Sequence, residues 1–423
     1  MASSFPYSIR AAFDNLIEGF EDRLTYAQVA TKIDLGDAQE QVYTRDRVWI
    51  PQPMIGSSYD GFDQTSNFDG LTQLWVPAQV GFHKASPKSL SAKAMRNKMA
   101  IDMYANEVGT KLASDVNRAV RNRVALEGAI YTKRTVAPTG SADLFLSSAQ
   151  MTEVGVPSGD RVAMIGVRNA IGMLSNVSDR QTMGDLSKKA YQDGELSARI
   201  AGFDVYTDDQ PIRLAPAAGG TTTVNGANQY WEPAATTTQT DGTENNRDNR
   251  WGQLVVTSAN IAGIKPGDAF TVAGVNSVHL ISKQDTGQLK TARVISVNTT
   301  TNTITYAPAF ISNGGNTIGG REYQNVTATP ANGAAITWLN TAIAEISPFF
   351  LRSAVGLLPG TFEVEPEDGW DIMQATTPKL GLRIICTKQG NINDLSTKMR
   401  WDIDFGTVLT QPEFAGAMQF NQV

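Results

Sequence analysis

Cysteine and histidine are nearly absent from this sequence, which holds one cysteine, Cys386, and two histidines, His83 and His279. A single cysteine excludes an intrachain disulfide framework and is typical of proteins from a reducing cytoplasm. A Ser-His-Asp triad would have to use one of the two histidines, and the G-x-S-x-G motif of a nucleophile elbow does not occur. HExxH and CxxC motifs are missing as well. We therefore predict a protein that is not an enzyme and that has no metal site and no cofactor.

Long apolar runs and a basic surplus are missing too. No apolar run reaches the length that spans a bilayer, and the opening MASSFPYSIRAAF lacks the basic and apolar blocks of a signal peptide, so we expect no membrane span and no secretory leader. Lys and Arg number 36 against 42 Asp and Glu, a net charge of −6. Because broad nucleic-acid binding normally needs a basic surplus, this balance disfavours sequence-independent binding. The length of 423 residues predicts roughly two to three domains.

The sequence does contain one long helical pattern, between residues 86 and 131. Pro87 disfavours helix in the residue before it, and Ser89 or Ser91 can cap the amides that follow, so we predict a helix of about 38 residues, roughly 57 Å long. Such a rod among β-rich segments is interpreted either as a core helix or coiled coil, or as the spine of an elongated subunit. Its apolar stripe consists of Met95, Met99, Ile101, Ala105, Val108, Leu112, Val116, Val120 and Val124.

Residues 8–30 predict a first helix with one apolar and one acidic face. The apolar stripe consists of Ile9, Phe13, Leu16, Ile17, Phe20 and Leu24, and the acidic face of Asp14, Glu18, Glu21 and Asp22. Two interpretations stay open for this helix. It packs on its own domain, or it is an arm laid on a neighbouring chain.

Residues 44–80 predict a long two-stranded loop. Two β-like runs, 47–50 and 71–80, flank a turn-rich middle segment whose tip contains Gly61. A bare hairpin of this length is marginal in water. We therefore expect something else to stabilise the loop, and a neighbouring subunit would serve.

At Gly219 the composition changes abruptly, and from there to Asn340 the chain is rich in Thr, Asn and Gly and has almost no helical period. Short β-like runs separated by sharp turns predict a small antiparallel β barrel or sandwich of about 120 residues. The segment 265–268, Lys-Pro-Gly-Asp, has Pro and Gly where a type II turn needs them. The polar segment TTTQTDGTENNRDNR, residues 236–250, predicts a projecting loop. The β-like runs lie at 253–257, 269–275, 292–297 and 303–307.

Mixed α and β structure is predicted on both sides of this module. Before it, a helix is expected to begin near Ser147, and residues 160–174 predict a buried strand followed by a short helix. After it, LGLRIICTKQG and KMRWDIDFGTVLTQ predict two strands. In the second of these, Met399, Trp401, Ile403 and Phe405 would share one face. Both flanks are therefore expected to belong to one fold into which the β module is inserted.

Four strings carry a resemblance to a known family: RVWIP at Arg47, AYQDGELSARIAGFD at 190–204, DNRWGQLVVTSANIAGIKPGDAFTVAGV at 248–275, and TKQGNINDLSTKMRWDIDFG at 387–406. The order of these strings and the place at which the β module is inserted are those of one family. The chain resembles the coat protein of short-tailed bacteriophages of the P twenty-two type. That resemblance implies an α+β fold of the Hong Kong 97 capsid type with an inserted all-β barrel. It divides the chain into an N-terminal arm (1–43), an extended β loop (44–85), a peripheral-domain spine helix (86–135), an axial domain in two parts (136–218 and 341–386), the inserted barrel (219–340) and return strands to the peripheral domain (387–423).

The resemblance also implies a function. The expected protein is a major capsid protein that assembles as pentamers and hexamers, with a scaffolding protein and a portal protein, into an icosahedral procapsid in the host cytoplasm. The shell would enclose double-stranded DNA without binding a particular sequence, and no membrane takes part. The candidate contact residues are Ser58, Tyr59, Asp60 and Phe62 at the tip of the extended loop, Asp241, Glu244 and Arg247 between capsomers, and Asp14 and Glu18 on the N-terminal arm.

Glu244 departs from the family pattern, because a basic residue is expected in that stretch, and this leaves the pairing partner open. Two other functional classes, an adhesin and an enzyme, are alternatives to the capsid hypothesis. A surface or secreted adhesin is suggested by the Thr- and Asn-rich module, but the missing leader and the long helix argue against it. An enzyme with an unfamiliar site is disfavoured by the scarcity of histidine.

Overall fold

The computed structural model of the protein describes residues 7–34, 47–178 and 199–423, apart from isolated positions and one short stretch. Those positions are 54, 57, 66, 67, 69, 71, 258, 316, 363, 365–370 and 392. The end of the predicted arm, 35–43, and residues 190–198 of the second matched string lie outside the described residues. The chain forms two compact units, unit 1 from 1–48, 77–121 and 355–408, and unit 2 from 49–76, 122–354 and 409–423.

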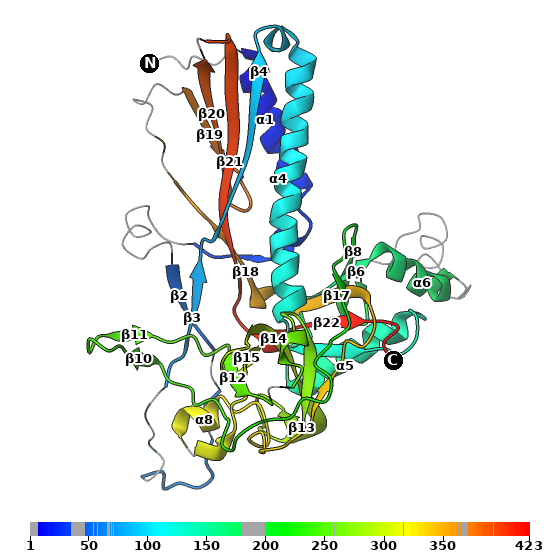
Figure 1. Ribbon diagram of the computed structural model, residues 1–423, viewed down its shortest axis with the longest axis vertical. Coiled ribbons are helices and arrows are strands. Elements are labelled where there is room, and N and C mark those ends of the chain that lie inside the picture. Colours follow the sequence, from blue (N-terminus) through cyan, green and yellow to red (C-terminus); the bar gives the residue numbers. More distant parts are fainter. Residues whose placement is uncertain are drawn as a thin grey trace. The chain divides into compact units, whose positions relative to one another are not determined.

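Unit 1 contains a six-stranded sheet whose strands β4, β21, β20 and β19 lie side by side in Figure 1. The strands are β1 (Thr31–Lys32), β4 (Phe82–Ser91), β18 (Val355–Pro359), β19 (Asp371–Thr376), β20 (Arg383–Asn391) and β21 (Ser396–Leu409). The predicted alternation in β21 is confirmed, since Met399, Trp401, Ile403 and Phe405 are all buried. Cys386 is also buried, and burial raises the pKa of its thiol to about 12, so it is an inert core residue.

The long helix α4 (Lys98–Glu127) begins about ten residues later than we predicted. The segment predicted to start it, which includes Ser89 and Ser91, belongs instead to β4, which pairs with β21 from Phe82↔Phe405 to Ser91↔Ser396. This ladder joins residues far apart in the sequence, so it outweighs a periodicity that is only local. Asn97 caps the real start, where its Oδ1 accepts a hydrogen bond from the amide of Ala100 at 3.3 Å. The stripe from Ile101 to Val124 is buried as predicted, but its predicted start is wrong, since Met95 precedes the helix and Met99 is 72% exposed.

The N-terminal helix α1 (Tyr7–Asp22), followed by the short α2 (Tyr26–Val29), packs on α4 within unit 1. Gly109 of α4 makes the close approach possible, because a Cβ at this position would lie 3.2 Å from Cγ of Leu16. Between the helices, the Nδ2 of Asn117 donates to the carbonyl of Arg23 at 3.0 Å. Ile9, Phe13, Leu16, Phe20 and Leu24 are at most 5% exposed. The structure therefore favours the interpretation in which this helix packs on its own domain.

Unit 2 contains a seven-stranded mixed sheet in the order β5-β22-β17-β6-β8-β7, with β9 on β17. Its elements are β5 (Ile130–Lys133), α5 (Ser141–Val154), β6 (Arg161–Gly166), α6 (Val167–Ser178), β7 (Arg199–Ile200), β8 (Phe203–Asp208), β9 (Arg213–Leu214), β17 (Ala344–Leu351) and β22 (Ala415–Gln419). The predicted strand and helix over 160–174 are confirmed as β6 and α6. Helix α5 begins six residues before the predicted start at Ser147, and Oδ2 of Asp143 in its first turn accepts from the amide of Thr139, which precedes the helix, at 3.0 Å.

The inserted module is a closed antiparallel barrel. Its sheet has the order β12-β15-β14-β13-β16, with strands β12 (Gly252–Val255), β13 (Ala269–Val278), β14 (Asp285–Asn298), β15 (Thr303–Ala307) and β16 (Ile336–Trp338). Residues 222–225 close it, because Val224 bridges Val256 beyond β12 and Thr223 bridges Ala335 beside β16. The predicted runs 269–275, 292–297 and 303–307 lie within β13, β14 and β15, and the run 253–257 overlaps β12, which ends at Val255. Gly267 has φ +92°, and the amide of Asp268 donates to the carbonyl of Lys265, as the predicted type II turn requires.

The two chain crossings into the barrel lie side by side. Before the insertion Arg213 pairs with Glu345 in the β9–β17 ladder. Asn340, which is fully buried, then joins both crossings. Its Nδ2 donates to the carbonyl of Ala215 at 3.0 Å and to Oδ1 of Asp268 at 2.9 Å, and its Oδ1 accepts from the amide of Ala269 at 3.0 Å. This neck holds the ends of the insertion together.

The barrel core lies inside the inserted segment, and we predict that an excised fragment 219–340 folds alone. The sixteen buried members of its apolar cluster all lie between Val224 and Trp338, and of the partly buried residues packed against them Ala217 lies two positions before the fragment. Circular dichroism of the fragment should give a β spectrum with little helix and a cooperative thermal transition. A spectrum of a disordered chain, or one with substantial helix, contradicts the prediction.

Candidate assembly surfaces

The extended loop has a two-stranded base, β2 (Arg47–Pro51) and β3 (Trp75–Gln79), as the sequence predicted. Its root is anchored on the barrel within unit 2. Leu74 is fully buried in an apolar cluster with Ala309, Ile311 and Tyr323. The Leu74 amide points to the Tyr323 hydroxyl at 3.4 Å, and the Leu74 carbonyl accepts from the amide of Gln52 at 2.8 Å. The chain's own barrel therefore stabilises the root of the loop.

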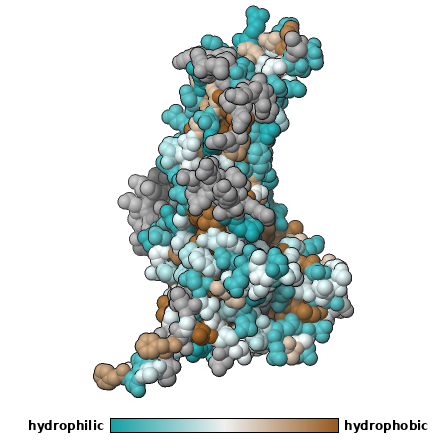
Figure 2. All heavy atoms as spheres, turned by 90° about the vertical axis from the view of Figure 1, so that its left-hand side faces the viewer, coloured by the Kyte–Doolittle hydropathy of each residue, from teal (hydrophilic) through white to brown (hydrophobic). Residues whose placement is uncertain are grey.

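The tip of the loop is exposed, in contrast to its root. Phe62 has 110% of its reference surface exposed and Phe68 has 87%, and Figure 2 shows apolar side chains at the outer end of the segment that projects at lower left. Ser58, Tyr59 and Asp60 are exposed as well. Gln64 bonds the tip to itself, through its Nε2 and the carbonyl of Gly61 at 2.7 Å. An aromatic side chain held out in water is a candidate contact for another surface.

The carboxylate of Asp63 forms hydrogen bonds within the tip. Asp63 Oδ1 accepts from both the amide and the hydroxyl of Thr65, at 3.0 and 2.6 Å. The Thr65 hydroxyl and then its amide lower the pKa of Asp63, so this carboxylate is charged near neutral pH. The tip thus combines exposed aromatic surface with negative charge.

The predicted projecting loop of the barrel is a hairpin of β10 (Thr236–Thr238) and β11 (Glu244–Asn246). Both Asp241 and Glu244 are exposed on it. Asp241 also closes the turn, since its Oδ1 accepts from the hydroxyl and amide of Thr243 at 2.7 and 3.0 Å, and these bonds lower its pKa. The two candidate carboxylates therefore lie on one polar hairpin that buries no apolar residue.

Arg247, the third candidate, lies at the base of this hairpin. Its guanidinium stacks over the ring of Trp231 at 4.1 Å, and burial lowers its pKa, although Glu232 opposes this shift. Arg247 is half-buried, unlike the two carboxylates. Sequence reasoning took it for a free surface charge because the aromatic partner lies sixteen positions earlier in the chain.

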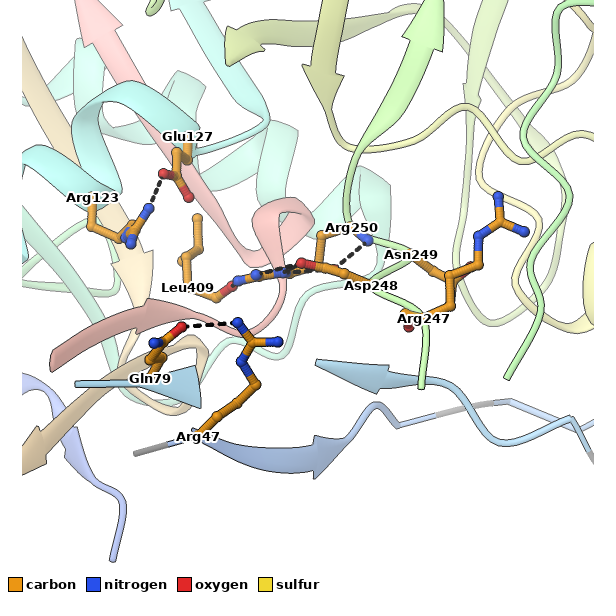
Figure 3. A network of polar contacts seen from close by, with 9 residues as sticks. All are labelled: Arg47, Gln79, Arg123, Glu127, Arg247, Asp248, Asn249, Arg250 and Leu409. Carbon is orange, nitrogen blue, oxygen red and sulfur yellow. Dashed lines mark hydrogen bonds and ion pairs between the residues drawn. The ribbon is translucent and has the colours of Figure 1, made fainter. Parts of the chain in front are cut away.

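Sequence reasoning missed the buried ion pair beside it. Figure 3 shows Arg250 and Arg247 extending in opposite directions from the segment between β11 and β12. The Arg250 side chain is 7% exposed and binds both carboxylate oxygens of Asp248, with Nη2–Oδ2 at 2.7 Å. Its Nη1 donates to the carbonyl of Leu409 at 2.8 Å. The Arg250 side chain, held by Asp248, therefore joins the hairpin base to the C-terminal segment of unit 2 through its bond to Leu409.

Buried Arg293 attaches the barrel to the end of α4. Its Nη2 donates to the carbonyl of Ala125 in the last helical turn at 2.7 Å, an arrangement that the negative end of the helix favours. Burial lowers the pKa of Arg293 to about 10, so it still carries its charge at neutral pH. Lys290, 5% exposed, pairs with Glu413 at 2.6 Å nearby. A charge inside the apolar run ARVISV was the sequence signal for this attachment.

The N-terminal candidates Asp14 and Glu18 are exposed on α1, opposite its buried stripe. They form an acidic strip on the outside of unit 1. The structure therefore presents the nine candidates on three separate elements, and eight of them, all except Arg247, are exposed to solvent. No helix in the described part of the chain is long and apolar enough to cross a membrane. Among the same residues, no cluster of His, Cys, Asp and Glu is placed to hold a metal ion.

A family model described as P22 coat protein, gene protein 5, matches residues 1–421. The chain belongs to the P22 coat protein family. This membership, together with the observed helices, sheets and inserted barrel, confirms the predicted α+β fold of the Hong Kong 97 type. The protein is a major capsid protein of a tailed phage, a structural protein of the virion that assembles with itself into an icosahedral shell. The adhesin alternative receives no support.

Several solved structures are similar to this chain. The CUS-3 coat protein I-domain is 40% identical over 29% of this chain and 96% of its own, with a TM-score of 0.23. A structure from Mycobacterium phage Che8 is 10% identical over 93% of this chain and 90% of its own, with a TM-score of 0.45. A virus-like particle from Pyrococcus furiosus is 7% identical over 97% of both chains, with a TM-score of 0.40.

We predict that Arg250→Ala destabilises the coat protein monomer by about 2–3 kcal/mol, because it leaves the Asp248 carboxylate partly buried without its bidentate partner. Lys111→Ala is the matched control. Lys111 is 65% exposed and pairs with Asp115 across one helical turn, so its loss should cost under about 1 kcal/mol. Thermal melts of the two variants check this difference, and equal melting temperatures would contradict it.

Proposed function

We propose that this coat protein forms its shell from pentamers and hexamers, guided by a scaffolding protein and closed around a portal protein, in the cytoplasm of the host. The division into arm, loop, spine helix, axial domain, inserted barrel and return strands belongs to this proposal. The net charge of −6 fits a shell that encloses DNA without binding a particular sequence. Negative-stain microscopy of the expressed protein, with and without its scaffolding protein, tests it. Closed particles that form only with the scaffold are the expected result.

The exposure of Phe62 carries the proposal for the extended loop. A fully exposed phenylalanine on a loop whose root is buried cannot contribute to the stability of its own chain. Burying such a ring against a neighbouring subunit would contribute to association, as aromatic anchors do at protein interfaces. Ser58, Tyr59 and Asp60 precede Phe62 in the chain, are exposed as well, and are proposed to complete the contact.

The charged hairpin supports a second contact, between capsomers. Exposed charges contribute little to the monomer, under about 1 kcal/mol each. Repeated at each copy of an interface in a closed shell, the same small contributions bias which shell forms. We assign this contact to Asp241 and Glu244, with Arg247 holding the hairpin base. Asp14 and Glu18 on α1 are proposed to receive a basic segment of a neighbouring chain or of an assembly partner.

Deletion of residues 57–62 should leave a folded monomer that forms no closed shells. The deletion removes the exposed tip and leaves the root at Leu74 and Tyr323 intact. Sedimentation of the assembly reaction measures closed particles, and circular dichroism checks the monomer. Phe62→Ser, which keeps the loop length, should show a weaker form of the same defect. Normal particles from the deletion variant would mean that the tip is not an assembly element.

Asp241→Asn combined with Glu244→Gln should misdirect assembly toward tubes or aberrant shells while the monomer keeps its melting temperature. The amide at position 241 keeps an acceptor for Thr243, so the change removes charge without removing the cap of the turn. The defect should change with salt, since exposed charges are screened over about 8–10 Å. Electron microscopy at two salt concentrations measures it. A lower melting temperature with normal particles would make the hairpin a folding element instead.

A further inference from the structure

We infer that the extended loop and the charged hairpin are energetically coupled through Trp231, so that fixing one of them in a contact also orders the other. The inference deepens the proposed function, on which it rests for the roles of the two elements. Its evidence is a set of contacts within unit 2 that join the roots of both elements. The term shared root is used below for Leu74, Trp231, Arg247, Asn249 and Tyr323.

The loop side of the shared root is the buried Leu74. Its cluster with Ala309, Ile311 and Tyr323 also includes Trp231, which packs against it from the hairpin side. The next residue of the loop, Trp75, forms a backbone bridge to Asp248, directly after the hairpin. The returning strand of the loop and the exit strand of the hairpin therefore lie against each other.

The hairpin side is held by the other surfaces of Trp231. Its ring lies under the guanidinium of Arg247 at 4.1 Å, and its Nε1 donates to Oδ1 of Asn249 at 3.2 Å. Asn249 spans the hairpin base, because its Nδ2 donates to the carbonyls of Ala234 at 2.8 Å and Arg247 at 3.1 Å. One indole thus completes the apolar cluster of the loop and positions the base of the hairpin.

Glycine 319 shows how tightly the two elements approach. A Cβ on Gly319, in the short helix α8 (Ile318–Glu322), would lie 3.4 Å from Cγ2 of Thr72 in the loop and 3.2 Å from the carbonyl oxygen of Pro233 before the hairpin. The loop and the hairpin therefore pack against the same turn of backbone. A shift of either element changes the space that is left for the other.

Coupling of this kind is reciprocal. If a neighbouring subunit holds the tip of the loop, the packing between the Leu74 cluster and Trp231 becomes more persistent, and the hairpin base that rests on the same ring loses mobility. The second contact is then made by a hairpin that is already ordered, at a smaller entropic cost. Assembly contacts at the two elements would reinforce each other without a direct bond between them.

Hydrogen exchange on the full-length monomer, read by mass spectrometry, tests the coupling in both directions. Arg247→Ala should accelerate exchange in the loop root, where the amide of Gln52 donates to Leu74, by roughly two- to fivefold, the factor expected for a lost cation–π contact. Leu74→Ala should accelerate exchange in the hairpin, where the amide of Arg247 donates to Ala235 and that of Gln239 donates to Thr243. Amides of β14 should be unchanged in both variants.

Two control variants separate the coupling from simple loosening. Glu244 lies on the same hairpin and is exposed, so Glu244→Ala should leave the loop root unchanged. Arg247→Lys keeps the charge without the planar stack and should fall between wild type and Arg247→Ala. Effects confined to the mutated element overturn the inference, and so does an equal rise in β14, which indicates global unfolding. Because the test uses the monomer, its failure leaves the proposed assembly contacts to be judged by particle formation.

Discussion

An inserted domain can fold only where its two chain crossings lie next to each other, and the neck at Asn340 meets this requirement. The β9–β17 ladder brings Arg213 opposite Glu345, and the buried amide of Asn340 then bonds to the crossing on the other side. One side chain with two donors and one acceptor bonds to the carbonyl of Ala215 in the first crossing and to Asp268 and Ala269, where β13 begins. The position of the barrel depends on this neck, and so do the positions of the hairpin and of the root of the extended loop, because both are attached to the barrel.

Buried cationic side chains also attach the barrel to the rest of unit 2. Arg293 reaches the end of α4, Lys290 reaches Glu413, and Arg250 reaches the carbonyl of Leu409. Such groups cost desolvation, and their hydrogen bonds have a fixed direction that apolar packing lacks. They therefore determine the orientation of the barrel on the mixed sheet of unit 2 more than they add to its stability. Exposed charge on the hairpin and the loop tip has a different physical role, because water and salt weaken it until a partner approaches.

The sequence predicted the local elements well and the long-range pairings poorly. The barrel strands, the type II turn at Gly267 and the alternation of β21 follow from patterns within a few residues, and each is confirmed. The start of α4 was wrong because Ser89 and Ser91 are paired with β21, some 300 positions away. The closing segment 222–225 is too short to carry a pattern.

The candidate contact residues show a further limit of sequence reasoning. Their exposure follows from polar, turn-rich segments, whereas the stacking of Arg247 on Trp231 and the burial of Arg250 depend on how the chain folds back. Family resemblance, carried by strings and their order, gave the function where single residues did not. Composition alone had excluded common catalytic sites.

Closure of the barrel has one more consequence. Across the described residues 219–257, 259–315 and 317–340, every barrel strand, including the segment 222–225, has a neighbour on each side. The bridges at Thr223 and Val224 therefore cover part of both sheet edges and leave fewer open amides and carbonyls onto which another strand could add. In a shell, many copies of this Thr-rich module are crowded at very high local concentration, a condition in which open strand edges template aggregation. Closure of the wall restricts that route, which favours contacts between neighbouring modules through side chains and hairpins.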